Sequence, residues 1–155
     1  MNEPTVDDGR AVLERLRARA PQAPPGWMMR RLVYVPAIIA INVLVFLAWW
    51  VATARGVRIV PGELLQGNGD PILVTLWRHF VISPLHLELG YFDALLGAAF
   101  SHAELWHLFL NMFVLWSFGS LLEKLWGRRL FIGFYLGAAV FANLVHCAVS
   151  QWLLD

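Results

Sequence analysis

Charged residues are scarce in this chain of 155 residues, in which aspartate, glutamate, lysine and arginine make up only 15% of the sequence. An average soluble domain carries about 25% charged residues. Hydrophobic residues, by contrast, make up 59% of the chain. The shortage of charge argues against an ordinary soluble fold, and no nucleic-acid partner is expected. The composition therefore predicts a protein whose main partner is the lipid bilayer.

Cysteine is also nearly absent, because Cys147 is the single one in the sequence. It cannot form an internal disulfide, and within an apolar run we interpret it as a small apolar side chain without redox chemistry. The first apolar run is also not expected to be a secretory signal. The first apolar run follows a polar segment of 31 residues and has no small-x-small cleavage site beside it. We therefore expect this run to remain in the mature protein.

Three long runs contain no charged residue, and they cover residues 32–52, 105–122 and 130–154. Each is near or beyond the roughly 17 to 25 residues that cross the hydrocarbon core of a bilayer. The sequence therefore predicts an all-α membrane protein with three transmembrane helices, at about 32–52, 105–122 and 130–152. The predicted domains are an amino-terminal segment, 1–31, and a membrane domain, 32–155.

The distribution of lysine and arginine predicts the orientation of these spans. Six arginines precede the first span, and three basic residues, Lys124, Arg128 and Arg129, occupy the turn between the second and third. The outer loop, 53–104, holds only three arginines in 52 residues. We expect the amino terminus to be cytoplasmic, with the protein integral to a bacterial inner membrane. Because long loops without structure of their own are uncommon, we also expect the outer loop to be partly helical.

Polar side chains stand at the start of the second span, in the sequence AFSHAELWHLFLNMF. His107 and Asn111 are four residues apart and therefore about 40° apart on one helical face, whereas His102 is expected just before the helix, with a separate partner. These groups can bond neighbouring helices, bind a metal or haem together with His146, or stabilise negative charge developing on an oxygen. The spacing lacks the glutamate placement of a zincin, so no metal or other cofactor is expected.

The wider segment, FSHAELWHLFLNMFVLWSFGSLLEKLWGRRLFIGFYLG, resembles the rhomboid intramembrane serine proteases. Their signature is H-x4-H-x3-N at the start of the second span, followed by G-x3-E and a G-R-x-x-F entry to the third. The matching residues here are His102, His107, Asn111, Gly119, Glu123, Gly127, Arg128 and Phe131. The resemblance implies a rhomboid-like helical bundle. In it, His107 and Asn111 would help to form the oxyanion hole, His102 would brace the loop, and Glu123 would anchor the inner end of the second helix.

The resemblance stops before the catalytic pair of that family. A rhomboid fold carries its nucleophilic serine in a G-x-S-G motif on the fourth helix and its general-base histidine on the sixth, and none of the five serines here stands in such a motif. The family's Trp-Arg motif is also displaced, because Asp93 and Ala94 occupy its usual places. We expect an amino-terminal half of the fold that is inactive alone. Its expected partners are transmembrane protein substrates or the missing carboxy-terminal half.

Small residues on the third span predict a further contact. Gly133 and Gly137 form a G-x3-G face that allows another helix to approach closely. If that helix is missing, the chain is expected to be unstable or to self-associate in detergent. The alternative to a protease is a non-catalytic rhomboid-like protein that binds transmembrane helices without cutting them.

Overall fold

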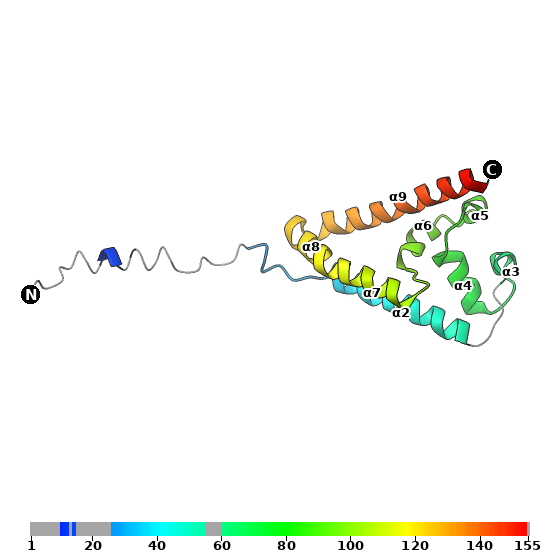
Figure 1. Ribbon diagram of the computed structural model, residues 1–155, viewed down its shortest axis with the longest axis horizontal. Coiled ribbons are helices and arrows are strands. Elements are labelled where there is room, and N and C mark those ends of the chain that lie inside the picture. The colour runs from blue at the N-terminus through cyan, green and yellow to red at the C-terminus, as the bar shows by residue number, and fades with distance from the viewer. Residues whose placement is uncertain (1–9, 13, 15–25, 55–59, 155) are drawn as a thin grey trace, which may run out of the picture. The chain divides into compact units, whose positions relative to one another are not determined.

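The computed structural model describes residues 10–12, 14, 26–54 and 60–154, and the regular elements among them are all helical (Figure 1). The chain divides into two compact units, Met1–Arg30 and Arg31–Asp155. In the first unit, the four described residues nearest the amino terminus are helical; they are Arg10, Ala11, Val12 and Glu14. The second unit contains every long helix of the described chain.

The second unit consists of three long helical segments and a helical loop. In chain order its elements are α2 (Tyr34–Ala54), α3 (Pro61–Gln66), α4 (Pro71–Phe80), α5 (Pro84–Glu88), α6 (Ala94–Gly97), the 3-10 turn η1 (Ala98–Phe100), α7 (Leu105–Val114), the π-helical η2 (Leu115–Gly119), α8 (Ser120–Trp126) and α9 (Arg128–Leu154). This confirms the predicted all-α membrane protein with a partly helical loop between its first two spans.

Three helical segments of the described chain are long and apolar enough to cross a membrane, and they are Tyr34–Ala54, Leu105–Trp126 and Arg128–Leu153. The turn between the second and third spans is shorter than the predicted bounds, 105–122 and 130–152, implied. Gly127 alone separates α8 from α9, with a φ of 82° that favours glycine. The helices continue through the charged residues because lysine, arginine and glutamate are good helix formers near a membrane surface.

The inner part of the unit closes around the beginning of α2. Val35 and Ile38 of α2 are buried against Phe131 of α9. Gly119 allows the second span to approach α2 closely, since a Cβ atom there would lie 2.8 Å from Leu115 Cδ1 and 3.3 Å from a Val35 methyl carbon. A larger side chain at this glycine would force the two helices apart.

The outer loop packs between the end of α2 and α9 (Figure 1). Ala52 of α2 is buried with leucines of α3 and α4, which are Leu64, Leu73 and Leu76. Gly97 of α6 passes directly over the α4 backbone, because a Cβ atom there would meet the carbonyl oxygen of His79. On the other side, Asn143 of α9 donates to the carbonyl oxygen of Leu95 at 2.9 Å. The loop is therefore held by packing and hydrogen bonds on two sides.

The G-x3-G face of α9 is uncovered by the residues that the structure describes. Nothing lies within 4 Å of the position that a Cβ atom would take at Gly133 or Gly137. Phe134 and Phe141 on the same helix are exposed. The predicted close contact with another helix is therefore not made within this part of the chain.

Candidate functional site

His102 and Asn111 are joined by a hydrogen bond at the outer end of the second span. His102 precedes α7 and is only 6% exposed, and its Nε2 lies 2.9 Å from Nδ2 of Asn111. A side-chain amide nitrogen only donates, so Nε2 must accept and the ring proton must lie on Nδ1. This bond uses one of the two amide protons of Asn111, and the second is left for another acceptor.

His107 lies on α7 four residues before Asn111, as the helical spacing predicted. It is exposed on α7, and its ring centroid lies 5.1 Å from that of His102 in an edge-on arrangement. We expected His102 to have a partner separate from His107 and Asn111, whereas in the structure His102 contacts both of them. The difference arises because the segment before α7 folds His102 back over the first turns of the helix.

The surroundings of His102 favour its neutral form. Burial lowers its pKa, the neighbouring His107 lowers the pKa further, and the backbone of Phe100 acts in the opposite direction. A neutral ring is the form that can accept the proton of Asn111. The electrostatics and the hydrogen bond therefore agree on the protonation state.

A cavity of about 320 Å³ lies beside this pair, between the second span and α9. Asn111 and His102 supply its polar side chains together with Tyr135, and His107 does not line it. The remaining wall is apolar and includes Leu115, Phe118, Leu122 and Phe134. Asn111 itself is exposed beside this wall, and an amide proton next to apolar side chains interacts more strongly with a negatively charged oxygen than one surrounded by water does.

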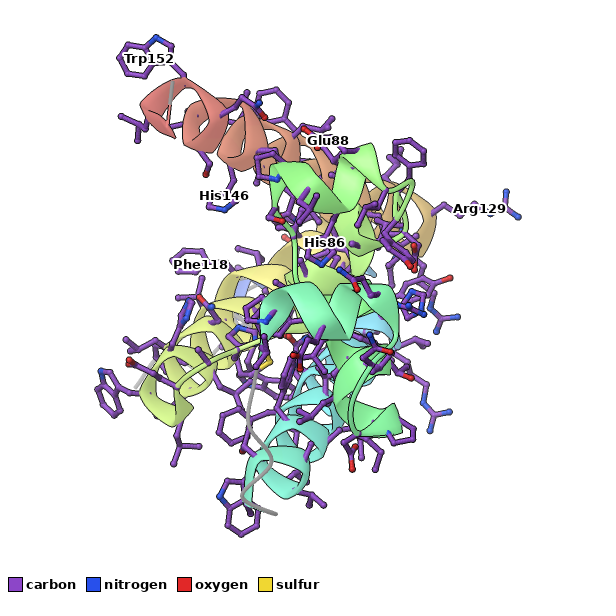
Figure 2. The ribbon with its side chains drawn as sticks, turned by 90° about the vertical axis from the view of Figure 1, so that its right-hand side faces the viewer. His86, Glu88, Phe118, Arg129, His146 and Trp152 are labelled. Atoms are coloured by element: carbon purple, nitrogen blue, oxygen red, sulfur yellow. The ribbon has the colours of Figure 1, made fainter. Side chains whose placement is uncertain are left out.

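His146 is exposed on α9, as Figure 2 shows, and does not join the other two histidines. Within the described ranges, no three histidine, cysteine, aspartate or glutamate side chains lie close enough to hold a metal ion. The structure thus brings together His102 and His107 but leaves His146 apart. A metal or haem site of the kind considered from the sequence required His146 to lie beside the other two histidines, and it does not.

Glu123 lies at the opposite, inner end of the second span and is 2% exposed. Its carboxylate oxygens accept backbone N–H groups from three residues at the start of α2; the partners are Val33 at 2.7 Å, Tyr34 at 3.0 Å and Val35 at 2.9 Å. The first N–H groups of a helix have no partner within that helix. Glu123 of α8 therefore caps α2 from a neighbouring helix.

The family's loop motif is replaced by other contacts. Asp93, at the usual place of the tryptophan, pairs with His79 at 2.5 Å, and Ala94 beside it is buried. Trp77 stands instead against α2, where its ring meets Trp49 edge-on at 6.2 Å. Trp77 therefore stabilises the outer loop from a different position in the sequence.

The outer loop contains a serine–histidine pair that was not predicted from the sequence. Ser83 Oγ lies 2.8 Å from Nδ1 of His86, whose Nε2 lies 3.0 Å from the carbonyl oxygen of Trp77. The carbonyl only accepts, so Nε2 donates and Nδ1 accepts from the serine hydroxyl. This is the arrangement of a nucleophile and its base. However, His86 is 1% exposed and burial lowers its pKa, which opposes the imidazolium that catalysis needs. The pair therefore stabilises the loop.

Acidification is expected to destabilise the protein through these two buried histidines. Burial lowers the pKa values of His86 and His102 below 6.5, so the unfolded chain binds protons that the folded chain does not. Their contribution to the free energy of unfolding is present above about pH 6.5 and is lost as the pH falls through the folded-state values. Thermal unfolding in detergent, followed by circular dichroism between pH 8 and pH 5, should show this loss.

The variant His86→Gln is expected to reduce the pH dependence of unfolding, because it removes one of the two groups. The exposed His146 provides the control, since His146→Gln should keep the slope of the native sequence. A slope that is equal in all three proteins would contradict the assignment of the effect to buried histidines.

Comparisons with known proteins agree on one family. Residues 90–153 match the family model described as the rhomboid domain. The human presenilin-associated rhomboid-like protein, mitochondrial, is 34% identical over 111 residues, covering 72% of this chain and 24% of the relative. Rhomboid protein 1, mitochondrial, of Saccharomyces cerevisiae is 32% identical over 118 residues, covering 74% and 27%. Rhomboid-like protease 2 of Toxoplasma gondii is 25% identical over 123 residues, covering 79% and 41%.

No solved structure shows a significant match to the chain. The chain spans about a quarter of the length of the human and yeast relatives. Both of these relatives are named mitochondrial, so the expected bacterial inner membrane finds no support. With its three apolar helices and its matching domain, the chain is an integral membrane protein that belongs to the rhomboid family.

Proposed function

We propose that this chain supplies the oxyanion-stabilising part of a rhomboid-type intramembrane serine endopeptidase, which cleaves transmembrane segments of membrane proteins. The observation that carries the proposal is the position of Asn111. One of its amide protons is held by the buried, neutral His102, and the other remains available at the edge of an apolar cavity. The similarity to a relative named a protease supports the same activity.

The proposed chemistry follows from this arrangement. Attack of a serine hydroxyl on a peptide carbonyl places negative charge on the carbonyl oxygen. A donor that is already oriented stabilises that charge without reorganising during the reaction. Asn111 would provide this donor, and the exposed imidazole of His107 next to His102 would provide a second. The nucleophile and general base would come from residues outside these 155, either on the same polypeptide or on a partner.

Reconstitution in proteoliposomes tests the proposal. Residues 1–155 alone should not cleave a fluorescent transmembrane substrate, since no serine in them stands in a G-x-S-G motif. Co-reconstitution with a polypeptide that carries the G-x-S-G serine and a later histidine should restore cleavage. This polypeptide would be encoded downstream in the gene or taken from a matched relative.

Two results would contradict the proposal. The first is cleavage by residues 1–155 alone, which would require a nucleophile in this chain. The second is a complex that forms and binds the substrate helix without cutting it, which would favour the non-catalytic rhomboid-like binding protein. A fluorophosphonate that blocks the restored cleavage controls for contaminating metalloproteases.

A further inference from the structure

A hydrogen bond links α2 to the segment that carries His102. The indole Nε1 of Trp49 donates to the hydroxyl oxygen of Ser101 at 2.9 Å, across 52 residues of sequence. Ser101 directly precedes His102 in the chain. We call the bonded pair of Trp49 and Ser101 the clasp.

The adjacent residues Ser101 and His102 are held by hydrogen bonds to two different helices. Ser101 is extended, with φ of −100° and ψ of 133°, and neighbouring side chains of an extended segment project to opposite sides. The hydrogen bonds follow this alternation, because Ser101 reaches α2 and His102 reaches α7. The direction of the His102 ring therefore depends on how Ser101 is held.

Ser101 is not closely packed on the side that faces α2 and α4. A cavity of about 350 Å³ lies there, and its lining includes Trp49, Ser101 and His102. A segment beside an open cavity has fewer neighbouring atoms to fix it than one in a filled core. The hydrogen bond is thus a principal restraint on the position of Ser101.

Trp49 is itself fixed in place. Its ring meets Trp77 of α4 edge-on, at 6.2 Å and 79°, and the carbonyl oxygen of Trp77 bonds to the buried His86. The next residue, Trp50, lines the same cavity but is 64% exposed, and it is Trp49 whose indole bonds to Ser101. The two neighbouring tryptophans therefore offer a matched comparison.

We propose that Trp49 and Ser101 are positioning residues for Asn111. They hold His102 so that its Nε2 takes one amide proton of Asn111 and fixes the direction of the other. The role rests on the proposed function, because the direction of that second proton matters for a reaction only if it meets the oxyanion. Neither residue of the clasp touches the reacting atoms in this arrangement, and both act through His102.

Nuclear magnetic resonance of isotope-labelled residues 1–155 in lipid nanodiscs tests the proposal without requiring cleavage. Trp49→Phe and Ser101→Ala each remove one side of the clasp. Both variants should shift the resonances of the Asn111 side-chain amide and of the His102 ring nitrogens. Ser101→Thr keeps the hydroxyl and should restore the native positions, while Trp50→Phe should leave them unchanged. Circular dichroism of every variant confirms that the helices are retained.

The proposal is overturned if both clasp variants leave these resonances within the change caused by Trp50→Phe. In the reconstituted protease, the clasp variants should lower kcat by between tenfold and about 10²-fold with little change in KM, as small misplacements of catalytic groups do. Normal kcat in both variants would also overturn it. If the clasp variants shift the Asn111 and His102 resonances but the native complex never cleaves a substrate, the proposed function fails while the positioning role stands.

Discussion

Replacing Asn111 by alanine should lower the cleavage rate of the reconstituted protease by about 10²- to 10³-fold, which is the usual effect of losing one oxyanion donor. The structure gives the reason. The amide is held by His102 at 2.9 Å before any substrate arrives, so in the proposed mechanism its free proton would stabilise the transition state without a cost of orientation. The loss should appear in kcat and in kcat/KM alike, since the interaction forms only as charge develops.

A matched control for Asn111→Ala is Ser117→Ala, six residues further along the same span. Ser117 is exposed on η2 and does not line the cavity beside Asn111, so its loss should change the rate by less than about threefold. Progress curves with a fluorescent transmembrane substrate measure both variants. A fall of less than tenfold for Asn111→Ala, in a protein that keeps its helicity, would show that Asn111 is not an oxyanion donor.

Replacing Glu123 by alanine should lower the free energy of unfolding by about 3 to 5 kcal/mol. Three backbone N–H groups of α2 would lose their acceptor, and each buried donor left unsatisfied costs about 1 to 3 kcal/mol. The expected loss is smaller than three times the largest cost of one donor, because Val33 is exposed and water can reach its N–H group. The start of α2 should fray, and its contacts with Phe131 should weaken as a consequence.

Unfolding by sodium dodecyl sulfate in mixed micelles measures this change. Glu123→Gln keeps one acceptor oxygen and should lie between alanine and the native residue, because hydrogen bonds to an uncharged oxygen are weaker. Glu63→Ala is the control, since Glu63 is exposed on α3 and should change stability by less than about 0.5 kcal/mol. Equal effects of Glu123→Ala and Glu63→Ala would contradict the capping role.

The helical architecture was predictable because the bilayer restricts what a sequence can do. Backbone groups in lipid must be satisfied within the segment, so a long run without charge indicates a helix whatever its neighbours are. The second span accordingly begins at Leu105, as the sequence predicted. The third begins at Arg128 instead of residue 130, because hydropathy cannot distinguish a charged helical residue from a charged turn residue.

The contacts around the candidate site were less predictable than the residues that form it. Helical angles placed His107 and Asn111 on one face, but the partner of Asn111 is His102, which lies outside the helix. The bond between Trp49 and Ser101 spans 52 residues and leaves no periodic signal. Such contacts depend on the path of the chain between the elements, and that path is decided by the packing of the whole loop.

The π-helical segment η2 changes what the second span can present to its neighbours. Asn111 and Glu123 are twelve residues apart, which in a regular α-helix would turn them about 120° away from each other. The five residues from Leu115 to Gly119 form a wider turn that accommodates one additional residue. The rotation between the two side chains then falls to about 20°. One inserted residue thereby places Glu123, which caps α2, and Asn111, the proposed oxyanion donor, along one side of the second span.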